Sequence, residues 1–95
     1  MTFDDLVFEE NYPNTPMLGV RAAVYFVNDY GASIICGPHS YGGSRGLYEM
    51  ALLLNGQVIS PLIVSDEVRN NVIGWLTPEQ VTVLLGKIEA LPDLK

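Results

Sequence analysis

The first apolar blocks of the chain are short and interrupted by turn residues. Residues 18–27 and 32–36 are dense in aliphatic and aromatic side chains, and Asn28-Asp29-Tyr30-Gly31 separates them. Asn and Asp tolerate left-handed backbone, and glycine accepts positive φ without steric cost. We therefore predict two antiparallel strands joined by a tight turn that includes Gly31.

A second pair of apolar blocks spans residues 47–54 and 57–64 and flanks Asn55-Gly56. Asn-Gly between two such blocks is the strongest short signal for a two-residue type I′ turn, so the pattern predicts a second hairpin. Pro61 has no backbone N–H to donate, which limits the later strand to a sheet edge or a bulge.

Near the C-terminus the apolar spacing changes to that of a helix. Thr77-Pro78-Glu79-Gln80 supplies an N-cap hydroxyl, a proline at the first helical position and a glutamine that can complete a capping box. Apolar residues then recur on one face, and Pro92 ends the pattern. They are Val81, Leu84, Leu85, Ile88 and Leu91.

Three segments carry weaker patterns. Residues 3–9 mix apolar and acidic positions and predict a strand, and residues 12–16 predict an extended connection. Residues 65–75 fit either a helical turn or a short strand. Trp75 lies among apolar neighbours, so we expect it in the core.

Together these elements predict one α+β domain over residues 1–95. Its sheet would have four or five antiparallel strands, built from the two hairpins and the N-terminal strand, with the C-terminal helix packed on one face. The other face would be left to solvent or a partner. Pairing through a sheet edge or this uncovered face would give a homodimer or higher homo-oligomer.

Composition and charge narrow the function classes. Eleven acidic against five basic residues give a net charge of -6, which argues against direct nucleic-acid binding and suits a basic partner. One cysteine and one histidine offer no metal-ligand spacing, and we expect no cofactor. No apolar run reaches membrane-spanning length, so we expect a cytoplasmic protein without membrane contact. Cys36 is expected to be a buried small side chain rather than a reactive thiol.

The segment 37–49, between the two predicted hairpins, holds four glycines, the only histidine, an arginine and two tyrosines in thirteen positions. Successive glycine amides beside Arg45 could bind a phosphate or carboxylate, and a tyrosine could stack on a base or fill a partner's pocket. Glu49 could form a salt bridge with Arg45 that fixes the loop. The candidate binding residues are His39, Ser40, Tyr41, Gly42, Gly43, Ser44, Arg45, Tyr48 and Glu49.

Other interpretations of this segment stay open. The glycines could serve turn geometry alone. His39, Ser40, Ser44 and Glu49 are ingredients of a hydrolytic site, yet their spacing does not enforce the geometry that such a site needs. The phosphate-binding P-loop pattern is absent. We therefore assign no catalytic residue and expect a protein that is not an enzyme.

The segment Gly-Pro-His-Ser-Tyr-Gly-Gly-Ser-Arg-Gly-Leu-Tyr-Glu at 37–49 resembles small uncharacterised proteins encoded by bacteriophages and prophages. Residues 28–31 before it and 73–79 after it contribute to the resemblance, which covers about residues 18–91. It implies an accessory protein in the cytosol of a bacterial host that binds a host factor, such as a component of antiviral defence, or sequesters a nucleotide signal. It assigns no catalytic residue.

Three functional hypotheses follow from these observations. The leading one is binding of a host protein, with the 37–49 loop in the contact surface. The alternative is sequestration of a small nucleotide, with glycine amides and Arg45 on phosphate. The second alternative is a small hydrolase that depends on His39.

Overall fold

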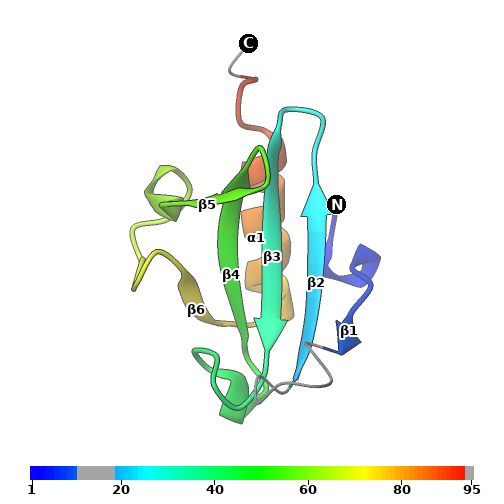
Figure 1. Cartoon of the computed structure of the whole chain (residues 1–95), viewed down its shortest axis with the longest axis vertical. Helices are drawn as coiled ribbons and strands as arrows, with labels where there is room; N and C mark the ends of the chain where they lie inside the picture. The colour runs from blue at the N-terminus through cyan, green and yellow to red at the C-terminus, as the bar shows by residue number, and fades with distance from the viewer. Residues whose placement is uncertain (11–18, 94–95) are drawn as a thin grey trace.

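One antiparallel sheet and one helix form the framework of the fold. The computed structural model describes residues 1–10 and 19–93, and within them helix α1 (Pro78–Glu89) lies along one face of a six-stranded sheet (Figure 1). The strands are β1 (Glu9–Glu10), β2 (Val20–Tyr25), β3 (Tyr30–Cys36), β4 (Tyr48–Leu54), β5 (Gln57–Ile59) and β6 (Ile73–Leu76). Three 3₁₀ turns are η1 (Phe3–Asp5), η2 (Gly43–Arg45) and η3 (Pro61–Ile63). The predicted α+β fold is confirmed.

The sheet order is β1-β2-β3-β4-β5, and β6 also pairs with β4. The first half of β4 pairs with β6, where Tyr48 lies opposite Leu76, and its second half pairs with β5, where Leu54 lies opposite Gln57. β3 pairs with the other side of β4, so β4 has a hydrogen-bonded neighbour on both sides along most of its length. The 37–49 loop links β3 to β4 at one end of the sheet (Figure 1).

The second hairpin forms as predicted, because Asn55 and Gly56 both adopt positive φ (52° and 80°), as a type I′ turn requires. Its later strand is shorter than predicted. β5 ends at Ile59, and Pro61 begins η3 instead of continuing an edge strand to residue 64.

The first hairpin is also confirmed, with one correction to its turn. Asp29 adopts the positive φ, at 72°, whereas Gly31 lies inside β3. A Cβ at Gly31 would stand 2.4 Å from the Val24 carbonyl oxygen. Glycine is needed there for close backbone approach and not for turn geometry.

The core lies between α1 and one face of the sheet. Alternate residues of β3 and β4 point toward the helix and are almost fully buried. The sheet contributes Ala32, Ile34, Met50 and Leu52, and the helix contributes Val81, Leu84, Leu85 and Ile88. The predicted apolar stripe of the helix is therefore its core face.

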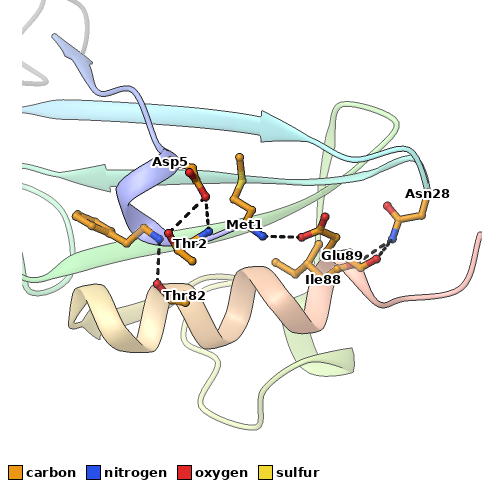
Figure 2. A network of polar contacts seen from close by, with 8 residues as sticks. Met1, Thr2, Asp5, Asn28, Thr82, Ile88 and Glu89 are labelled. Atoms are coloured by element: carbon orange, nitrogen blue, oxygen red, sulfur yellow. Dashed lines mark hydrogen bonds and ion pairs between the residues drawn. The ribbon is translucent and has the colours of Figure 1, made fainter.

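Both ends of α1 are capped. At its start the Gln80 amide donates to Thr77 Oγ1 (3.2 Å), and the Thr77 amide donates to Gln80 Oε1 (2.9 Å), which is the predicted capping box. At its end the side chain of Asn28 reaches from the β2–β3 turn. Its Nδ2 donates to the carbonyl oxygens of Ile88 and Leu91 (2.9 Å each), and the first of these contacts is visible in Figure 2.

The prediction of a strand over residues 3–9 is wrong for most of that segment. Residues Phe3–Asp5 form η1 instead, and the chain becomes a strand only at Glu9–Glu10. The Phe3 amide donates to Thr82 Oγ1 (2.9 Å), and the Met1 ammonium pairs with Glu89 (3.1 Å), so this segment docks on α1 (Figure 2).

The extended connection predicted at 12–16 lies outside the described residues. No helix in the described part of the chain is both long and apolar enough to span a bilayer.

Candidate functional site

The 37–49 loop is held together by its own hydrogen bonds. Ser40 Oγ donates to the Gly37 carbonyl (3.0 Å) and accepts from the Gly37 amide (2.9 Å). Gly42 and Gly46 flank η2 in left-handed conformations, with φ of 89° and 73°. These bonds give the loop a defined shape.

Further hydrogen bonds within the loop occupy glycine amides that were candidates for anion binding. The Gly43 amide donates to Ser40 O (3.1 Å), the Gly46 amide to Gly43 O (3.0 Å) and the Leu47 amide to Gly42 O (3.0 Å). An anion-binding nest needs successive amides that point outward together. Those three donors are directed into the loop.

The potential hydrolytic residues of this loop are not arranged as a catalytic pair. His39, Ser44 and Arg45 are exposed, whereas the Ser40 hydroxyl is engaged by Gly37. Among the described residues no hydrogen bond joins His39 to Ser40, Ser44 or Glu49. A nucleophile and its base need such contact. Cys36 is half-buried, with its sulfur 3.9 Å from the Gly43 carbonyl oxygen.

Glu49 fixes the loop, but through a different partner from the one expected. Its Oε1 accepts a hydrogen bond from the Tyr41 amide (2.9 Å), and no ion pair with Arg45 forms in the described chain. The predicted Arg45–Glu49 salt bridge is therefore wrong, while the predicted role of Glu49 in holding the loop is retained.

Trp75 is the main correction to the sequence interpretation. It was expected in the core, yet its side chain is 43% exposed at the surface of β6. Its ring lies against the Tyr41 ring (centroids 5.1 Å apart), and the Arg69 guanidinium carbon lies 5.5 Å from the ring centroid. Trp75 thus contacts both an aromatic ring and a cation.

The backbone of Trp75 is left-handed, with φ of 53°. This conformation is a genuine outlier for a bulky side chain and typically costs about 1–3 kcal/mol. Such strain persists only where surrounding contacts fix it, and it clusters at functional positions.

A tight turn positions Arg69 beside the tryptophan. Arg69 and Val72 exchange two backbone hydrogen bonds (2.8 and 3.1 Å), and between them Asn70 and Asn71 both have positive φ (51° and 63°). Asn70 Nδ2 also donates to the Tyr41 hydroxyl. We name Tyr41, Arg69, Asn70 and Trp75 the Trp75 cluster.

Two glycines allow the loop to approach β6 closely. The Trp75 amide donates to the Tyr41 carbonyl (3.2 Å). A Cβ at Gly74 would stand 2.4 Å from Tyr41 Cβ, and a Cβ at Gly42 would stand 2.9 Å from Trp75 Cα. Larger residues at either position would separate the two segments.

A groove of about 300 Å³ opens beside the cluster. It is lined by Arg69, Trp75 and the start of α1 at Gln80, with Glu67 adding a carboxylate. Its lining is therefore mixed in charge rather than basic.

Tyr48 does not join the other candidate binding residues. Its ring packs against Phe3 (4.9 Å) and Phe8 (5.5 Å) on the helix side of the sheet. Burial, and to a lesser degree the nearby Cys36 thiol, raise the pKa of the Tyr48 phenol above its ordinary value. Tyr48 thus belongs to a packing cluster.

Tyr41 was predicted from the sequence, whereas Arg69, Asn70 and the exposure of Trp75 were not. The available signal was Asn70-Asn71, since asparagine pairs can supply the two positive φ angles of a type I′ turn.

No group of three or more His, Cys, Asp or Glu side chains that could hold a metal ion occurs in residues 1–10 and 19–93. Comparison with protein-family models, curated proteins and solved structures finds no match to this chain.

Proposed function

We propose that the chain is a non-enzymatic binding protein that captures a partner protein through the Trp75 cluster. The observation that carries this proposal is the half-exposed Trp75, which has a left-handed backbone conformation and contacts both Tyr41 and Arg69. Tryptophan, tyrosine and arginine are the residue types that most often dominate the free energy of protein association.

Preorganisation supports the proposal. Tyr41 is fixed at three points, by Glu49 at its amide, Trp75 at its ring and Asn70 at its hydroxyl. Ordering a side chain on binding costs roughly 0.5–1.5 kcal/mol. A cluster that is already ordered avoids much of that cost.

The net charge of the chain favours a partner with a basic surface. The net charge of -6 would steer a basic protein surface toward this one. A phage or prophage origin, with a host defence protein as the target, is part of this proposal and rests only on the sequence resemblance.

Sequestration of a nucleotide is the second candidate, and one observation favours it. A base could stack on the exposed Trp75 ring while Arg69 contacts phosphate. Two observations argue against nucleotide binding: the loop amides point inward, and the Glu67 carboxylate in the groove would repel a phosphate.

The test is affinity capture from a bacterial host lysate, followed by native mass spectrometry and titration calorimetry with the identified partner. We expect Trp75→Ala to weaken binding by about 2 kcal/mol or more, or roughly 30-fold, as at other hot spots. Leu62→Ala removes another exposed apolar side chain, 60% exposed on η3, and should bind normally.

A thermal-shift screen against nucleotides separates the two candidates, because a ligand that binds the folded state raises the melting temperature by mass action. A nucleotide-dependent shift lost in Arg69→Ala would favour sequestration. Equal binding of a captured protein by wild type, Trp75→Ala and Leu62→Ala would refute the assignment of the cluster.

A further inference from the structure

A hollow of about 330 Å³ lies next to the groove beside the Trp75 cluster, and we name it the α1 hollow. Its lining comes from residues 65–67, from β6 and from the first half of α1. Figure 1 shows the segment between η3 and β6 at one side of α1. The hollow and the groove share Glu67, Leu76 and Gln80 in their linings, so the two adjoin each other.

Apolar side chains form much of the lining of the α1 hollow. Ile73, Leu76 and Leu84 line it and are almost fully buried, whereas Val83 lines it and is 59% exposed. An exposed aliphatic side chain beside a concave apolar surface is stabilised when a partner covers both. The α1 hollow therefore fits an apolar side chain better than a polar one.

The size of the α1 hollow limits what it can take. Its lining runs along α1 from Glu79 to Leu84, a length of about 7.5 Å at 1.5 Å per residue. An extended chain rises about 3.3 Å per residue, so two or three residues of a partner span the hollow. We therefore expect it to contact a short segment and not a broad surface.

Both charged side chains that line the α1 hollow are acidic. They are Glu67, from the segment before β6, and Glu79, from the first turn of α1. Both are exposed, and neither carboxylate forms a hydrogen bond or ion pair within residues 1–10 and 19–93. Arg69 and Lys87 line neighbouring hollows, and in this part of the chain neither forms an ion pair with these carboxylates. The two acidic groups can therefore accept hydrogen bonds from cations of a partner.

We propose that the α1 hollow takes an aliphatic side chain of the partner protein, and that Glu67 and Glu79 bind Lys or Arg residues of the same segment. Alternate residues of an extended chain point to the same side. A segment with the order basic–x–aliphatic–x–basic therefore directs its apolar side chain into the hollow and its two cations toward the carboxylates. This inference rests on the proposed function, and it specifies the chemistry of the partner that contacts the surface next to the Trp75 cluster.

The sequence of the chain argues against a second copy as the occupant. Its five basic residues are Arg21, Arg45, Arg69, Lys87 and Lys95. No two of them are four positions apart, so no segment of this chain has the order basic–x–aliphatic–x–basic. An acidic segment would be repelled by Glu67 and Glu79. The occupant therefore belongs to a different, basic protein.

A short peptide tests this chemistry directly. The probe is acetyl-Lys-Gly-Leu-Gly-Lys-amide, titrated to about 10 mM into the nitrogen-15-labelled chain while NMR follows the backbone amide shifts. One buried aliphatic side chain and two exposed charge pairs give a low affinity, so we expect a dissociation constant in the millimolar range. The shifts should concentrate in residues 65–67, β6 and the first half of α1.

Two control peptides separate the apolar contribution from the charge. Acetyl-Lys-Gly-Ser-Gly-Lys-amide lacks the aliphatic side chain, and acetyl-Glu-Gly-Leu-Gly-Glu-amide reverses both charges. Each should bind at least about threefold more weakly than the probe. The proposal is wrong if either control binds as the probe does, or if the probe at 10 mM shifts none of the lining residues. Lining shifts that depend on protein concentration without peptide would assign the hollow to a second copy and would also overturn it.

Charge-reversal variants test the two carboxylates. Glu67→Lys and Glu79→Lys should each weaken probe binding at least about threefold, because a like charge then faces the cations of the peptide. Glu10→Lys makes the same change in net charge on β1, at the opposite side of the sheet from β6, and should bind normally. Circular dichroism checks that each variant is folded. An equal loss in Glu10→Lys would mean that net charge alone attracts the peptide, which would contradict the proposal.

The same variants, measured against the captured partner, separate this inference from the proposed function. Loss of partner binding in Trp75→Ala, with normal binding by Glu67→Lys and Glu79→Lys, would keep the Trp75 cluster as the binding site and overturn this inference alone. Loss in Glu67→Lys and Glu79→Lys, with normal binding by Trp75→Ala, would support the α1 hollow and refute the assignment of the cluster.

Discussion

Replacing Asn28 by alanine should strongly destabilise the fold, because this side chain joins the first hairpin to the end of α1. Asn28 is buried, with 7% of its surface exposed. Its Nδ2 donates to Ile88 O and Leu91 O at 2.9 Å, and more weakly to Glu89 O at 3.4 Å. Its Oδ1 accepts from the Tyr30 amide at 3.1 Å.

The magnitude follows from these contacts. Each of the three shorter hydrogen bonds contributes about 1 kcal/mol net, so their loss should lower the free energy of unfolding by about 3 kcal/mol. A chain of this length is stabilised by roughly 5–14 kcal/mol in total, and each kcal/mol corresponds to about 4–8 °C. We therefore expect the melting temperature to fall by about 12–24 °C. Asn28 does not have positive φ, so alanine meets no backbone penalty there.

Urea denaturation followed by circular dichroism measures this loss. Asn28→Asp keeps the acceptor for the Tyr30 amide but places a carboxylate against helix C-terminal carbonyls, so it should be at least as destabilising as alanine. Gln57→Ala removes an exposed amide side chain and should change stability by no more than about 0.5 kcal/mol.

A loss of less than about 1 kcal/mol in Asn28→Ala, at an unchanged denaturant slope, would contradict the role given to this side chain. An Asn28→Asp variant as stable as wild type would contradict it as well. Either result would mean that water replaces the side chain at the helix end without loss.

Three further changes test other parts of the structure. Gly86→Ala should raise the free energy of unfolding by about 0.5–1 kcal/mol in urea melts, because a Cβ on this α1 residue meets nothing within 4 Å; a loss would contradict that. Gly74→Ala should lower it by about 1–3 kcal/mol and alter the fluorescence of the single tryptophan, since the new Cβ would displace Tyr41; an unchanged spectrum would argue against the close approach. The raised pKa of Tyr48 means that the unfolded chain loses its phenolic proton first, so this contribution to stability is complete below about pH 10 and is lost as the pH rises further. The free energy of unfolding should therefore fall less steeply above about pH 10 in Tyr48→Phe than in wild type. The same slope in both proteins would refute this.

The elements that the sequence predicted correctly are those with local causes. Asn55-Gly56 sets its turn through backbone preferences, and Thr77 and Gln80 cap α1 within one helical turn. The prediction over residues 3–9 failed because η1 docks on α1 through Thr82, a residue far away in the sequence.

The candidate site was only partly predictable. Glu49 was correctly expected to fix the 37–49 loop, yet its partner is the Tyr41 amide and not Arg45. Tyr48 follows the same loop in sequence, but strand alternation turns its ring to the helix side. Arg69 joined the site through a turn whose Asn70-Asn71 signal was not recognised.

The amino-acid sequence alone determined the hairpins, the capped helix and their α+β arrangement, because hydrophobic periodicity, turn chemistry and capping act between near neighbours. Tertiary structure decided that Gly31 is a point of close approach and that Trp75 remains at the surface, in contact with Tyr41 and Arg69. It also decided that Asn28 caps a helix sixty residues away in the sequence. These outcomes depend on which surfaces meet when the sheet and helix pack, and contacts between distant segments leave no periodic signal in the chain.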